Sequence, residues 1–204
     1  PATRRLMDAV PGMREWLGLV PTAAALEACY LPCQGQLPDG TRVGAGFISL
    51  LSNVLDARGI RSRAAVLTAQ AIHHAAATDR EQRWLSLACG AAHPMVKAAA
   101  TVRALGLPEP DTTLVDLDRR SLQLAQRHAR TAQLNRLTAV RGNVLHRDGV
   151  AGPRFASTGS TVTRDYDLVE AIGLLEYLGL DDWEYRYGSV IRTKQKLAGA
   201  RTFL

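Results

Sequence analysis

The sequence predicts a doubly wound α/β fold with a mostly parallel sheet and an N-terminal helical extension. Strand and helix patterns alternate from residue 81 onward, which is typical of a parallel sheet covered by helices. The first strand pattern ends in a turn of small residues, Cys89-Gly90-Ala91-Ala92. Residues 1–80 show apolar side chains at helical spacing and no strand pattern.

Two apolar stripes at helical spacing close the N-terminal region. The first stripe comprises Leu50, Leu51, Val54 and Leu55, and the second comprises Ile60, Ala64, Leu67 and Ala71. Between them Gly59 is predicted to break the helix. These apolar faces need a partner, and we expect residues 1–80 to pack their helices against the domain that follows. The predicted α/β domain is 81–204.

Four strands are predicted in the second domain, at 84–88, 112–116, 137–141 and 166–172. Helices are predicted at 95–105 and 119–135, because their apolar residues recur at helical spacing. Residues 146–164 are rich in Gly, Ser and Thr, which indicates a loop. A polar helical stretch is predicted over 185–204.

Composition restricts the classes of function. Hydrophobic residues make up 47% of the chain, which is enough for a packed core. No apolar run approaches the roughly 18 residues needed to span a bilayer, so we expect a cytoplasmic protein without a membrane partner. The net charge of +6 is spread thinly, which argues against a nucleic-acid partner. Cys29, Cys33 and Cys89 are too few and too scattered for a zinc site, and no metal is expected.

Unusual residues follow each predicted strand, where ligands bind in doubly wound sheets. Small residues around Gly90 let the chain turn sharply and let a ligand approach its backbone. Asp116 ends the second strand, where a carboxylate can accept hydrogen bonds from two ribose hydroxyls. Asn143 follows the third strand and carries an amide suited to an adenine edge, and the apolar Ile172-Gly173 follows the fourth.

These motifs, in this order, resemble the class I S-adenosylmethionine-dependent methyltransferases over residues 84 to about 180. The resemblance rests on A-C-G-A-A after an apolar strand, V-D-L-D, G-N-V-L, and Y-D-L-V-x-x-I-G-L-L-E-Y-L. It implies a Rossmann-like fold, S-adenosyl-L-methionine as cofactor, and methyl transfer to a small-molecule acceptor, a carboxylate or a hydroxyl. The segments S-L-A-C-G and I-G-L-L-E-Y-L also resemble bacterial methyltransferases that esterify fatty-acid carboxylates. The resemblance further implies that the helices of residues 1–80 form a lid or substrate region.

The resemblance implies a cofactor site made of Ser86, Ala88, Cys89, Gly90, Asp116, Leu117, Asn143, Val144, Ile172 and Gly173. In this family the loop after the first strand lies against the methionine part, and Asp116 would hold the ribose. Leu117, Asn143 and Val144 would surround the adenine, while Ile172 and Gly173 would line the floor.

Three departures from the family pattern leave an alternative open. Ser86 stands where the family usually has an acid, and Asn143 stands where it often has Asp. Ala88 and Ala92 replace glycines, which is tolerable only where the backbone avoids positive φ. The alternative is a catalytically inactive, methyltransferase-like binding or interaction module. A dinucleotide-binding domain fits less well, because only Gly90 remains of the required G-x-G-x-x-G.

No catalytic residue is assigned from the sequence. Glu176 and Tyr177 follow the fourth strand and His93 lies beside the first loop, and all three are also ordinary surface or core residues. The family builds about seven strands, whereas the sequence predicts four. We therefore expect either a longer natural chain or a second copy or partner that covers the open edge of the sheet.

Overall fold

The computed structural model describes residues 9–20, 22–78, 80–144, 166–172 and 201–203. The chain divides into two compact units, Pro1–Val66 and Leu67–Leu204, and each is described by itself. The division falls inside helix α5 (Leu55–Thr78), whereas the predicted domain boundary at residue 80 follows the end of that helix.

The first unit is helical. It contains α2 (Met13–Leu19), α3 (Ala23–Tyr30), the 3-10 turn η1 (Pro32–Gln34), α4 (Ala45–Asn53) and the start of α5. Its core gathers around Phe47 and Leu51 of α4, which are 1% and 2% exposed. The Arg61 guanidinium donates to the carbonyl oxygens of Cys29 at 2.8 Å and Leu51 at 2.9 Å. It thereby satisfies carbonyl groups in the last turns of α3 and α4.

Helix α5 corrects one prediction. The break between the two helical stripes lies at Val54, whose backbone is extended, and not at Gly59, which lies inside α5. A single interior glycine costs a helix only about 1 kcal/mol, and the neighbouring Ala57 and Ile60 pack into the first core and hold the helix. Although α5 has 24 residues, none of the described helices is both long and apolar enough to cross a membrane.

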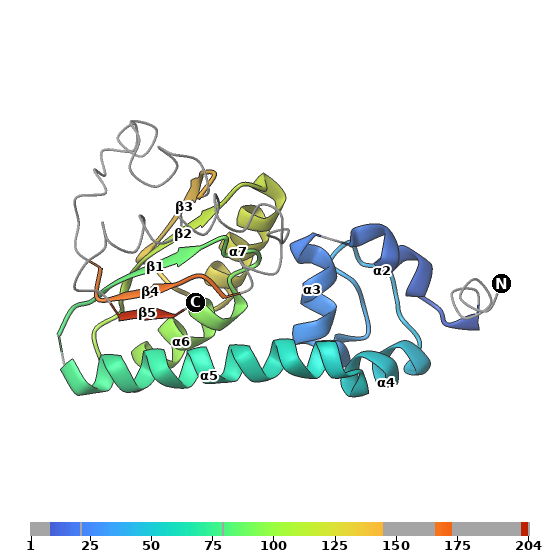
Figure 1. Ribbon diagram of the computed structural model, residues 1–204, viewed down its shortest axis with the longest axis horizontal. Coiled ribbons are helices and arrows are strands. Elements are labelled where there is room, and N and C mark those ends of the chain that lie inside the picture. The colour runs from blue at the N-terminus through green and yellow to red at the C-terminus, as the bar shows by residue number, and fades with distance from the viewer. Residues whose placement is uncertain (1–8, 21, 79, 145–165, 173–200, 204) are drawn as a thin grey trace, which may run out of the picture. The chain divides into compact units, whose positions relative to one another are not determined.

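The second unit is built on a parallel sheet (Figure 1). Its strands are β1 (Arg83–Leu87), β2 (Asp111–Asp116), β3 (Leu137–Arg141), β4 (Leu168–Glu170) and β5 (Arg201–Phe203). Their order is β3-β2-β1-β4-β5, and every adjacent pair is parallel. This is the doubly wound, Rossmann-like order, in which the chain reverses direction across the sheet between β1 and β4. The predicted fold class is confirmed.

Both faces of the central strands are buried, which explains their nearly continuous apolar sequences. Trp84, Leu114 and Leu168 are fully buried on one face, where they pack against α6 (His93–Ala104), α7 (Arg119–Thr131) and the end of α5. Leu85 and Val115 are fully buried on the other face. Because side chains alternate between the faces of a strand, each strand contributes to both cores.

The fifth strand corrects the prediction of a helix over 185–204 and the prediction of four strands. Arg201–Phe203 pairs with β4 in parallel, with Leu168 opposite Arg201 and Glu170 opposite Phe203. Thr202 and Phe203 favour strands, and the open edge of β4 offers unpaired backbone groups. The rest of that predicted helix, and the predicted loop at 146–164, lie outside the described residues.

Candidate cofactor site

Hydrogen bonds connect the carboxyl ends of four neighbouring strands. The Cys89 amide, after β1, donates to the carbonyl oxygen of Val115 in β2 at 3.0 Å. The Gly142 amide, after β3, donates to the carbonyl oxygen of Asp116 at 2.9 Å. On the other side, Ser86 of β1 lies opposite Glu170 of β4. The predicted site residues of these strands therefore meet at one edge, at the topological switch point.

The loop after β1 alternates between ordinary and left-handed backbone. Ala88, Gly90 and Ala92 have φ values of 51°, 54° and 53°. Glycine adopts this conformation freely, whereas an alanine there costs about 1–2 kcal/mol. Alanine was expected to be tolerable at Ala88 and Ala92 only if the backbone avoided positive φ. Both residues have positive φ, so this condition is not met. The loop keeps the shape of a glycine-rich turn and carries strain at two alanines.

Asp116 joins this loop to the loop after β2. Its Oδ2 accepts a hydrogen bond from the Gly90 amide at 2.8 Å, and its Oδ1 accepts one from the Asp118 amide at 2.8 Å. The side chain is half-buried, and each carboxylate oxygen can accept a second hydrogen bond. Two acceptor positions therefore remain for a ligand, which is what a vicinal diol requires.

Two apolar residues and one polar residue lie close to Asp116 in the loops after β2 and β3. Leu117, directly after β2, is 59% exposed. Asn143 is exposed and Val144 is 9% exposed, and both directly follow Gly142, whose amide is bonded to Asp116. The structure thus places Leu117, Asn143 and Val144 on the β2 and β3 side of the site.

On the β4 side, the structure reveals a residue that the sequence interpretation missed. Glu170 is only 5% exposed and accepts hydrogen bonds from the Ser86 hydroxyl and, at 2.8 Å, from the Ile172 amide. Burial raises the pKa of Glu170 from 4.5 to about 7, although these two hydrogen bonds act in the opposite direction. The sequence signal that could have identified this residue is a glutamate inside the apolar run Leu168-Val169-Glu170-Ala171.

The Cys89 thiol is subject to the negative charges of both carboxylates, Asp116 and Glu170. Burial raises the pKa of its thiol well above the usual value, and the charges of Asp116 and Glu170 raise it further. The thiolate is the reactive form of cysteine. The Cys89 side chain, which packs against the core formed with α6 and α7, therefore stays neutral and is not a nucleophile.

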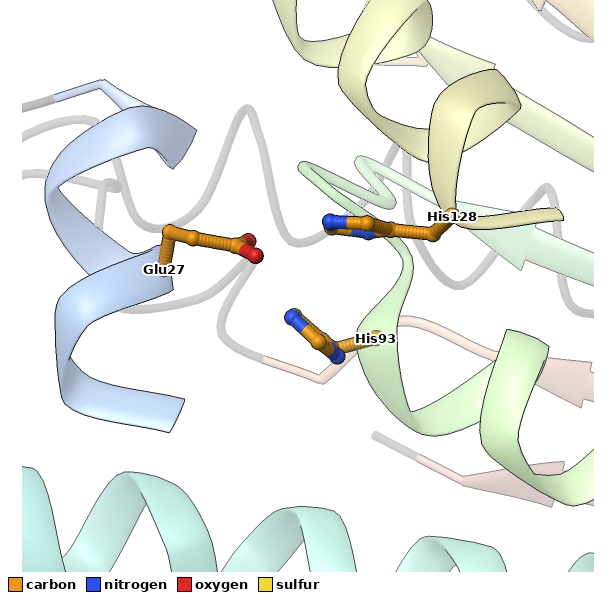
Figure 2. A group of neighbouring side chains, drawn as sticks. All are labelled: Glu27, His93 and His128. Carbon is orange, nitrogen blue, oxygen red and sulfur yellow. The ribbon is translucent and has the colours of Figure 1, made fainter. Parts of the chain in front are cut away.

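His93, the first residue of α6, stacks against His128 of α7 with ring centroids 4.3 Å apart (Figure 2). The Nδ1 atom of His128 lies 3.0 Å from the carbonyl oxygen of Ala91. Because a carbonyl oxygen only accepts hydrogen bonds, the Nδ1 atom of His128 is the donor of this bond, which holds the loop. Figure 2 also labels Glu27, a residue of α3 in the first unit.

Three predicted positions receive no structural account. Gly173, which was predicted to line the cofactor, and the two catalytic candidates Glu176 and Tyr177 lie outside the described residues. Ile172 is described: it is partly buried and packs against the core beneath α6 and α7.

No protein-family model and no curated protein matches the chain. Similar solved structures include a SAM-dependent methyltransferase from Thiobacillus denitrificans in complex with S-adenosyl-L-homocysteine, at 17% identity over 69% of this chain and 44% of that chain, with a TM-score of 0.43. TrmN from Thermus thermophilus matches at 21% identity over 65% of this chain and 34% of that chain, with a TM-score of 0.44.

A SAM-dependent methyltransferase from Agrobacterium tumefaciens matches at 16% identity over 52% of this chain and 30% of that chain, with a TM-score of 0.39. The chain spans less than half the length of each of these three proteins. Likeness of this degree does not establish a function. The function is therefore inferred from the residues of the chain itself.

The strain in the loop after β1 predicts a stabilising substitution. Ala88→Gly removes the clash of the Cβ atom at φ 51° and adds chain entropy to the unfolded state. We expect a net gain of roughly 0.5–1 kcal/mol in the free energy of unfolding, measured by chemical denaturation. The matched control is Ala100→Gly in α6, where the backbone is helical and a loss of about 1 kcal/mol is expected. A loss at Ala88 equal to that at Ala100 would contradict the strain.

Glu170 predicts a dependence of stability on pH. Its carboxyl ionises near pH 4.5 when unfolded and near pH 7 when folded. The folded state therefore binds more protons between these values, and its stability falls as the pH rises through that window. Glu170→Gln removes this loss, so the variant should gain about 3 kcal/mol on the parent between pH 4.5 and pH 8.

The measurement is the free energy of unfolding at both pH values, for the parent, for Glu170→Gln and for Glu15→Gln. Glu15 is exposed on α2, so its variant should follow the parent at both pH values. A Glu170→Gln variant that also follows the parent would show that the carboxyl is not buried as described.

Proposed function

We propose that this chain binds S-adenosyl-L-methionine at the carboxyl edge of its sheet and serves in methyl transfer to a small-molecule acceptor. The observation that carries the proposal is the carboxylate of Asp116. It ends β2, is fixed by the Gly90 and Asp118 amides, and keeps two acceptor positions beside the loop after β1. A ribose with two free hydroxyls matches this arrangement.

The surrounding residues fit the other parts of that cofactor. The exposed Leu117 offers an apolar surface to an adenine ring, and Asn143 offers an amide to its polar edge. On the opposite side of Asp116, the loop Ala88–Gly90 has only small side chains, which leaves space for the methionine part. When bound, S-adenosyl-L-methionine would supply a methyl group on a positively charged sulfur.

In this proposal the protein contributes position rather than acid–base chemistry. Methyl transfer needs the acceptor in line with the methyl group, and orientation alone provides a large part of such rate enhancements. The described residues include no reactive thiol at the site, since Cys89 stays protonated. A carboxylate acceptor would be ionised at neutral pH and would need no base, whereas a hydroxyl acceptor would need one.

Direct binding tests the proposal. Calorimetric titration of the parent with S-adenosyl-L-methionine and S-adenosyl-L-homocysteine should show one site for each. Asp116→Asn removes the charge that strengthens two hydroxyl hydrogen bonds, so we expect its affinity to fall by roughly ten- to a hundredfold.

The control variant is Asp111→Asn, which changes the same type of residue at the opposite end of β2 and should bind like the parent. Thermal melts of all three proteins without ligand separate a loss of affinity from a loss of fold. Binding without turnover of any carboxylate or hydroxyl acceptor would favour the alternative, an inactive binding module. No heat with either ligand, or equal affinity of the parent and Asp116→Asn, would overturn the proposal.

A further inference from the structure

Glu170 is a buried carboxyl group at the edge of the proposed site, and the proposed function does not use it. It is the last residue of β4 and lies opposite Ser86 in the register of the sheet. It is 5% exposed, and Ser86 is fully buried. Glutamate is almost never buried to this degree unless a charged partner accompanies it.

The partners of Glu170 are neutral donors. The Ser86 hydroxyl donates to Oε1, and the Ile172 amide donates to Oε2. Within the described residues, no lysine, arginine or histidine forms an ion pair with this carboxyl. A carboxylate offers about four acceptor positions, so roughly two stay available and the charge has no counter-ion from the described chain.

The place of Glu170 relative to Asp116 suggests what supplies the counter-ion. The two carboxylates lie on β4 and β2, the strands on either side of β1. Glu170 is level with Ser86 and with Leu114, which is two residues before Asp116. Adjacent strands are about 4.8 Å apart and a strand rises about 3.3 Å per residue, so the two backbone positions are roughly 12 Å apart. Both charges act on the Cys89 thiol in the loop between them. A ligand whose ribose reaches Asp116 would extend its other arm across Cys89 toward Glu170.

We infer that Glu170 recognises a cationic group on the arm of the bound ligand and passes its own proton to the solvent when that group binds. The inference rests on the proposed function, in which the ligand carries an α-ammonium group and a sulfonium. The carboxylic acid loses H⁺ to buffer, and the resulting carboxylate pairs with the cation. Among the described residues, Cys89 is the titratable group on which the charge of Glu170 acts, and the charge of Asp116 acts on the same thiol.

Proton release on binding tests this inference. The heat of binding is measured at pH 7.0 in phosphate and in Tris, and the difference gives the number of protons released per ligand. Because the pKa of Glu170 is about 7, we expect the parent to release about half a proton more than Glu170→Gln at this pH, and less at pH 8.5. At pH 8.5 the variant should also bind about tenfold more weakly, because it lacks the charge.

Three ligands identify the cation. Release with both S-adenosyl-L-methionine and S-adenosyl-L-homocysteine indicates the ammonium group, and release with the first alone indicates the sulfonium. 5′-Methylthioadenosine has neither cation and should bind without releasing the proton. Ser86→Ala removes a hydrogen bond that favours the ionised carboxyl, so release should persist to higher pH in that variant.

The outcomes separate the two proposals. Heat of binding with equal proton release by the parent and Glu170→Gln would overturn the role of Glu170 and leave the cofactor site standing. Equal release with the uncharged 5′-methylthioadenosine would also overturn it. No heat of binding with any of the three ligands would remove the proposed function and this inference together.

Discussion

Asp116 is the residue on which the geometry of the sheet edge after β1, β2 and β3 depends. Its two carboxylate oxygens accept hydrogen bonds from the Gly90 and Asp118 amides, and its main-chain carbonyl oxygen accepts one from the Gly142 amide. One residue thereby fixes the chain after three successive strands. Hydrogen bonds to a charged acceptor contribute about 1.5–3 kcal/mol each, so this residue holds backbone that would otherwise have several conformations.

The hydrogen bonds to Asp116 offset a conformational cost in the loop after β1. Ala88 and Ala92 are held in left-handed backbone, at a cost of about 1–2 kcal/mol for each alanine. Asp116 holds this loop by the Gly90 amide, and His128 holds it by the Ala91 carbonyl. Alanines thus occupy two left-handed positions of this turn, because contacts from β2 and α7 determine its shape.

The sequence was sufficient for the fold and for part of the site. Strands buried on both faces produce apolar runs such as Leu85–Leu87, and the acid that ends β2, Asp116, lies at the carboxyl edge of the sheet as predicted. Glu170 was missed because its partner Ser86, which lies beside it in the sheet, is 84 residues away in the sequence. The end of α4 was misplaced because Gly59 is a local helix breaker whose neighbours are held by tertiary packing.

Whether a nucleoside ligand occupies this edge is tested most directly by hydrogen–deuterium exchange, with and without saturating S-adenosyl-L-homocysteine. A ligand bound at this edge should slow exchange in residues 88–92, 116–118 and 142–144, which follow β1, β2 and β3. Exchange in α2–α4, which contain none of the predicted cofactor contacts, should stay unchanged. Protection confined to residues outside these three segments, at a ligand concentration that saturates binding, would contradict the assigned site.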